Sequence, residues 1–158
     1  MHAFFTSIRD HCNSLLYGLP KYEIQRLQHA LNSATRLITL SHKFDHITPL
    51  LMSLHWLPIE QRIEFKLLLF TYKALHDTAP SYIKDLLEPY VPHRHLRSAK
   101  KMLLREPAYN LHSYGHRSFS VSAPRLCNAL PFELKCSPSS VNSFKNGLKT
   151  FRFKKAFF

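Results

Sequence analysis

Apolar residues recur most densely between residues 48 and 75, and two prolines divide this stretch. Pro49 and Pro58 each stand where a helix can begin, because the fixed φ of proline suits the first turn and its missing N–H is not needed there. The pattern predicts a short helix over about 49–55 and a long one over about 58–75. The long helix carries a wide apolar stripe at steps of three and four, made of Ile59, Ile63, Leu67, Phe70 and Ala74.

A helix that is apolar around so much of its circumference must be covered on several sides. The predicted fold class is therefore mainly α, a small irregular helical bundle around a central helix at about 58–75. Trp56 stands in the corner between the two proline-started helices, and we expect it to be buried as a wedge that sets their crossing angle.

Two more helices are predicted before this pair, over about 4–19 and about 20–39, with Gly18 and Pro20 between them. The first would bury a face that includes Cys12 and Leu15. The second has its apolar stripe at Ile24, Leu27, Leu31, Ala34 and Ile38.

The pattern becomes less regular after residue 75. A short helix is predicted over about 80–87, and Pro89 ends it. Residues 93–112 show no reliable period, and we expect an extended loop that could include a short strand at Lys101–Leu104. Spacing favours a helix over 118–129 in spite of Pro124; the alternative is a strand over 118–122 followed by a helix that begins at Pro124.

The last predicted helix has Ser139 or Ser140 as its cap, and basic residues on or near the face opposite its apolar stripe. That stripe consists of Val141, Phe144, Leu148 and Phe151. The expected domain organisation is a helical bundle over 1–90, a basic loop-rich linker over 91–117, and C-terminal helices over 118–158 that pack on the bundle.

Charge is distributed very unevenly along the 158 residues. Residues 1–92 hold nine basic and eight acidic side chains, or +1, and residues 93–158 hold thirteen and two, or +11, which together give the net +12. Such an asymmetry favours an anionic partner for the second half, with nucleic acid ahead of a membrane surface. A basic surface that is merely solvated is the alternative.

Several kinds of chemistry are missing from the sequence. With only three glycines it has no glycine-rich phosphate loop, and no cysteine pair has zinc-site spacing, so we predict no metal and no cofactor. After Glu88 only Glu106 and Glu133 are acidic, too few for a two-metal phosphoryl-transfer site in the basic half. The three cysteines, and the lack of a signal sequence or a long apolar run, predict an intracellular protein, cytoplasmic or nuclear.

Several strings carry a family resemblance. FDHITPLLMSLHWLP (44–58), RIEFKLLLFTYKALH (62–76) and YGHRSFSVSAPRLCNALP (114–131), together with DHCNSLLYGLP, LNSATRLI and APSYIKDLLEPY, resemble the C-terminal part of reverse transcriptases from non-LTR, LINE-type retrotransposons. The resemblance runs in order over about 4–153.

That family of transposable elements encodes RNA-directed DNA polymerases, whose fingers, palm and catalytic aspartate pair lie upstream of the matching region. No Asp-Asp pair occurs in this chain. The resemblance therefore implies a post-palm, thumb-like fragment with no catalytic residue, which binds RNA or DNA backbone without sequence preference and has an upstream polymerase domain as a further partner.

Two other hypotheses remain. The chain could be a helical interaction module whose exposed central stripe docks on a missing polymerase domain, or a decayed, truncated copy with no function. For nucleic-acid binding, Tyr109 or Tyr114 is the candidate for stacking on bases. The candidate phosphate contacts are Arg94, Arg97, Lys100, Lys101, Arg105, Arg117, Arg125, Lys145, Lys149 and Arg152.

Overall fold

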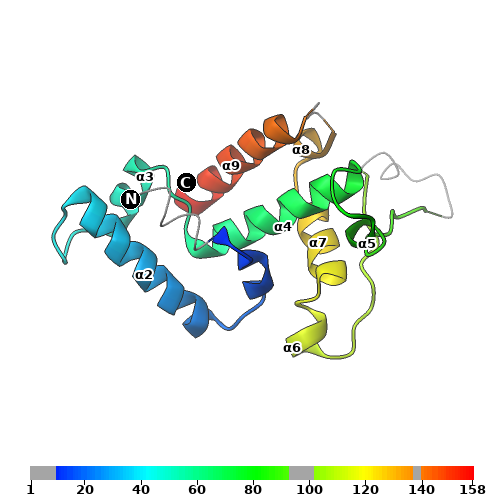
Figure 1. Ribbon diagram of the computed structural model, residues 1–158, viewed down its shortest axis with the longest axis horizontal. Coiled ribbons are helices and arrows are strands. Elements are labelled where there is room, and N and C mark those ends of the chain that lie inside the picture. Colours follow the sequence, from blue (N-terminus) through cyan, green and yellow to red (C-terminus); the bar gives the residue numbers. More distant parts are fainter. Residues whose placement is uncertain (1–9, 93–101, 137–139) are drawn as a thin grey trace. The chain divides into compact units, whose positions relative to one another are not determined.

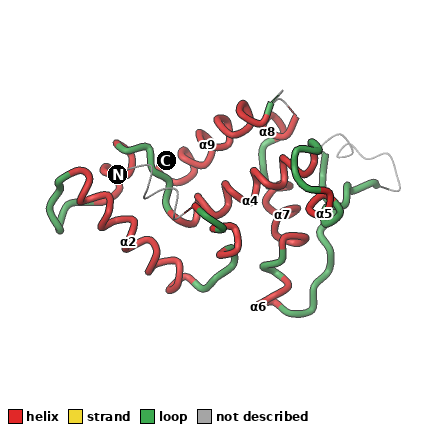
Figure 2. Tube along the Cα trace, in the orientation of Figure 1, coloured by secondary structure: helices red, strands yellow, loops and turns green. Residues whose placement is uncertain are grey.

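The computed structural model describes residues 10–92, 102–136 and 140–158 (Figure 1). Helices dominate these ranges and no strand occurs within them, which confirms the mainly α fold class (Figure 2). The residues form two compact units. The first unit comprises the described residues up to 65 together with 149–158, and the second unit comprises those between 66 and 148. These limits differ from the three segments expected from the sequence.

The first unit is built on α2 (Lys21–Thr39), which follows Pro20, and α3 (Ile47–Ser53), which packs against α2. Both helices lie close to their predicted positions. Trp56 is almost completely buried, as predicted. The core cluster of the unit consists of Leu31, Leu51, Trp56, Ile59 and Ile63.

The central helix, α4 (Ile59–Leu75), begins directly after Pro58, in agreement with the prediction. The side-chain oxygen of Gln28, on α2, accepts a hydrogen bond from the Ile59 N–H over 2.9 Å and so satisfies one of the orphan donors of the first turn. Four of the five residues in the predicted stripe are buried and Phe70 is half-buried. The stripe is therefore core, and the expectation that it is exposed for docking is wrong.

The predicted helix over 4–19 is only partly within the described residues, since residues 1–9 lie outside them. Asp10 is helical, but between residues 11 and 19 the chain forms only a 3-10 turn, η1 (Asn13–Leu16), and Cys12 and Leu15 are exposed rather than buried. Cys12 has a φ of 52°, in the left-handed region, which ends any regular helix there and turns the following side chains to new directions.

In the second unit, α5 (Ser81–Lys84) is shorter than predicted, and the structure adds α6 (His112–Gly115) and α8 (Phe132–Cys136). The strand considered at 101–104 is absent from its described part, residues 102–104. An isolated antiparallel bridge joins Leu104 to Pro89 instead.

One continuous helix, α7 (Phe119–Asn128), contains Pro124, so the prediction of a helix is confirmed and the strand alternative is wrong. A proline inside a helix removes one hydrogen bond and crowds the preceding turn. Burial offsets this cost, because Val121, Ala123, Cys127 and Pro124 itself are all buried.

The last helix, α9 (Val141–Phe157), begins as predicted, with the Ser140 hydroxyl accepting a hydrogen bond from the Ser143 N–H over 3.2 Å. Phe144 and Leu148 are buried, as predicted. No helix in the described ranges is both long and apolar enough to cross a membrane.

Candidate nucleic-acid interface

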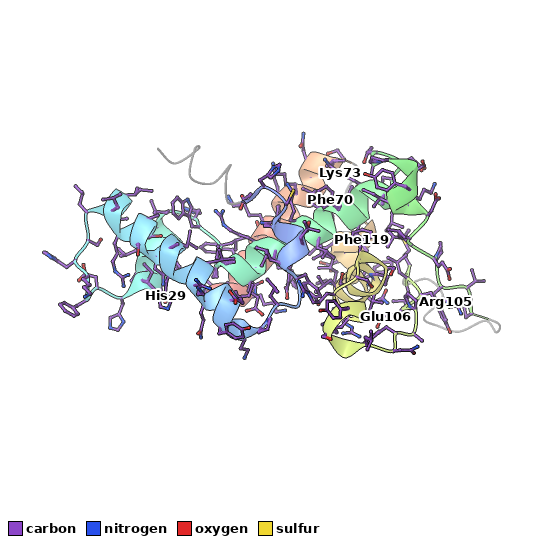
Figure 3. The ribbon with its side chains drawn as sticks, turned by 60° about the horizontal axis from the view of Figure 1, so that its bottom comes forward. His29, Phe70, Lys73, Arg105, Glu106 and Phe119 are labelled. Atoms are coloured by element: carbon purple, nitrogen blue, oxygen red, sulfur yellow. The ribbon has the colours of Figure 1, made fainter. Side chains whose placement is uncertain are left out.

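In the second unit, side chains of α7 hold the extended segment that leads from Met102 toward α6. Asn128 accepts a hydrogen bond from the Leu104 N–H and donates one to the Leu104 carbonyl, each over 2.9 Å. The Asn128 amide thus bonds both the N–H and the carbonyl of one residue, as a residue of a neighbouring strand would. It places Glu106 next to Asn128 at the end of α7, whereas Arg105 lies farther out on the same segment (Figure 3).

Arg125 projects from the last turn of α7 into a half-buried cluster. Its Nε lies 3.7 Å from a Glu106 carboxylate oxygen, and a terminal N–H donates to the Tyr109 hydroxyl over 3.4 Å. The guanidinium carbon is also 5.9 Å from the centroid of the Tyr109 ring, within the range of a cation–π contact. The positive charge of this predicted phosphate contact is thus partly neutralised inside the chain.

Arg105 has a more open environment. It lies 3.3 Å from a Glu88 carboxylate oxygen, and the two side chains are 69% and 67% exposed. An ion pair this exposed contributes little free energy, since water screens both charges. A phosphate group can therefore replace Glu88 at small cost, and Arg105 stays a candidate contact.

The two candidate stacking residues differ in their surroundings. Tyr109 packs so closely on α6 that a Cβ added at Gly115 would lie 2.7 Å from the Tyr109 Cβ, and its ring meets His116 edge-on at 6.1 Å between centroids. The Tyr114 side chain, on α6, is 74% exposed. Tyr114 therefore presents the more accessible ring, while Arg117, just after α6, is half-buried.

Along α9 the lysines and the arginine behave differently. Lys145, in the second unit, and Lys149, in the first unit, are both exposed, as are Lys154 and Lys155. Arg152, in contrast, is only 2% exposed and forms an ion pair with Glu64 of α4.

The assignment of Arg152 as a phosphate contact is therefore wrong. The apolar stripe of α9 advances in steps of four from Phe144 to Leu148, and Arg152 is the next residue on that ridge. Burial lowers the pKa of its guanidinium, and the Glu64 carboxylate acts in the opposite direction by favouring the charged form. Its Nε donates to no acceptor in the described part of the chain.

Four of the predicted contacts, Arg94, Arg97, Lys100 and Lys101, lie outside the described residues. Within the described ranges, no three His, Cys, Asp or Glu side chains are grouped as a metal site would require.

Sequence reasoning missed the acidic partners Glu88 and Glu106. In the sequence, Glu106 directly follows Arg105, which was the only indication that a carboxylate lies near these arginines. This adjacency does not reveal that the Glu106 carboxylate pairs with Arg125 and not with Arg105.

Comparisons of the chain with protein-family models, with curated proteins and with solved structures found no match.

Proposed function

We propose that this chain is a non-catalytic segment that binds RNA or DNA through the phosphate backbone, without sequence preference, in the manner expected of the thumb-like C-terminal part of a LINE-type reverse transcriptase. The observation that carries the proposal is the composition of α9. This helix has five basic and no acidic residues, and four lysines on it are exposed. Uncompensated, solvated lysines gain most from phosphate, because binding releases the counterions condensed on the nucleic acid.

The proposed contacts differ in part from those that the sequence suggested. Arg105 belongs among them because its ion pair with Glu88 is exposed and weak. Tyr114 supplies an exposed ring on which an unpaired base can stack. Arg152 is left out. In the first unit the lysines proposed to contact phosphate are Lys149, Lys154 and Lys155, and in the second unit it is Lys145.

A salt titration of binding tests the proposal. Fluorescence anisotropy with labelled single-stranded RNA, single-stranded DNA and duplex DNA of one sequence gives the affinity at salt concentrations between about 50 and 200 mM. For five phosphate contacts on a single strand, the four lysines and Arg105, log affinity should fall with log salt at a slope of about −3.5. A flat response would exclude phosphate binding.

Charge-neutral variants locate the contacts. Changing all four exposed α9 lysines to Gln should remove most of the salt slope. A matched control with the same loss of charge elsewhere changes Lys21, Lys43, Lys73 and Lys84 to Gln, and it should retain the slope. Equal losses in the two variants would mean that only net charge matters and that α9 is no interface.

A protein-interaction role has one observation in its favour, at a different place from the central stripe. Leu37, Leu40 and Phe44, at the end of α2 and just after it, are large apolar side chains that are mostly exposed. Apolar residues grouped at a surface are typical of protein contacts. Size-exclusion chromatography with light scattering should then show self-association at low and high salt alike, and the double variant L40S/F44S should abolish it.

A further inference from the structure

The second unit contains a cavity of about 310 Å³. One wall comes from α4, where Leu68, Tyr72 and Leu75 line it, and another from the paired segments around Pro89 and Leu104. Residues of α7, α8 and α9 complete the lining. All lining residues belong to the second unit, and none is a proposed phosphate contact. Its volume falls at the lower end of the range for small-molecule sites.

The most buried aromatic ring of the cavity, that of Tyr72, is poorly suited to stacking on a nucleobase. The Tyr72 ring is stacked against His76 at 3.9 Å and against Phe144 at 4.0 Å between centroids, so its stacking surface is already occupied by protein. Most of the remaining lining is aliphatic, with Leu103 and Leu130 among the residues that form it. Such a lining offers few donors and acceptors to a base edge and favours an apolar ligand.

One positive charge stands at the α7–α8 end of this cavity. Lys135, on α8, lines it, and its ammonium donates to the Asn128 carbonyl over 3.0 Å. Cys127, on α7, lines the same region; burial raises the pKa of its thiol, and the nearby Lys135 charge works against that rise. No Asp or Glu is found among the lining residues of the described chain. An apolar space with one cationic group fits a ligand with one anionic group.

We propose that this cavity binds a small amphiphilic carboxylate, with its hydrocarbon part among the leucines and its carboxylate on Lys135. The volume sets the ligand size. A dry cavity of about 150 Å³ lined by Leu, Ile and Phe takes benzene. A space of about twice that volume takes about twice as many atoms, or about twelve non-hydrogen atoms. Decanoate has this size, and decanol has the same hydrocarbon chain without the charge.

Titration calorimetry of the full chain with decanoate, below its micellar range, tests the site. The expected result is saturable binding of decanoate at one site. Decanol should bind about tenfold more weakly, because it lacks the charge-assisted hydrogen bond to Lys135. The variant K135Q should bring decanoate down to the affinity of decanol and leave decanol unchanged. The control K84Q removes an exposed lysine of the same unit that does not line the cavity. It should change neither the affinity for decanoate nor the affinity for decanol.

A second variant tests the location. L103W adds volume at a half-buried lining residue and should abolish binding of both ligands. Far-UV circular dichroism checks that helix content is retained, and L75W, at a more exposed lining position, serves if L103W does not fold. Three results would each overturn the proposal: no saturable binding, binding that persists in the tryptophan variant that folds, or equal losses of decanoate affinity in K135Q and K84Q.

Discussion

Two arginine–glutamate pairs, one in each unit, show how burial separates structural from exchangeable charges. In the first unit, Arg152 and Glu64 have side chains only 3% and 15% exposed. In the second unit, Arg105 and Glu88 are 69% and 67% exposed. The chemistry of the two pairs is the same. The buried guanidinium of Arg152 depends on the Glu64 carboxylate, because water cannot reach the site and take the place of that carboxylate. The exposed guanidinium of Arg105 can exchange the Glu88 carboxylate for water or phosphate.

The largest expected effect comes from breaking the buried pair. The variant E64L should destabilise the chain by about 3–5 kcal/mol, because it leaves Arg152 buried without a counter-charge. Urea denaturation followed by circular dichroism measures the change. The double variant E64L/R152M should recover most of the loss, since apolar residues of similar volume can replace a buried ion pair. A double variant as unstable as the single one would contradict this account of the pair.

A smaller loss is expected when the second unit loses the side-chain hydrogen bonds of Asn128 to Leu104, because backbone hydrogen bonds to residues 88 and 90 also hold this segment. N128A removes both hydrogen bonds to Leu104 and should cost about 2 kcal/mol, at about 1 kcal/mol for each bond. The same denaturation experiment measures it. N128D should not recover the loss: it keeps the acceptor for the Leu104 N–H but places a carboxylate beside the Leu104 carbonyl and the Glu106 carboxylate. Equal stability of N128A and the unchanged chain would mean that the segment around Leu104 is held by other contacts.

The second unit also has a buried ionisable group, the Cys127 thiol. Because burial raises the pKa of this thiol, the folded state holds its proton more tightly than the unfolded state. Its contribution to stability is complete below the ordinary thiol pKa and is lost as pH rises through the raised value.

The variant C127A should therefore lose less stability than the unchanged chain between pH 7 and pH 10. The comparison of the two chains cancels the titration of lysines and tyrosines, which both share. Thermal unfolding at each pH provides the measurement. Parallel pH profiles would show that Cys127 is not the group responsible.

The smallest effect should come from the exposed pair. R105A should change the free energy of unfolding by no more than about 0.5 kcal/mol, because the pair with Glu88 is well solvated. The same variant should nevertheless reduce the salt slope of nucleic-acid binding by about 0.7 on a single strand. A large loss of stability would make Arg105 a structural residue like Arg152.

The sequence by itself determined the helices that have strong local signals. Pro58 marks the start of α4, a serine at 139 or 140 was predicted to cap α9, and the apolar periodicity places the core-facing stripes of α2 and α4. These features depend on a few neighbouring residues, so they can be predicted from spacing alone. The continuous helix through Pro124 was also predicted, although only burial explains how its cost is offset.

Tertiary structure alone decided which basic side chains are exposed and so able to contact phosphate. Arg152 and Lys149 are both basic residues of one helix, yet the first is buried against Glu64 and the second is exposed. Their difference depends on a carboxylate 88 residues away in sequence, which no local pattern reveals. The same reason applies to the cavity beside Lys135, whose walls come from segments far apart in the chain. Contacts between such segments are fixed by packing, and packing depends on every side chain that shares the space.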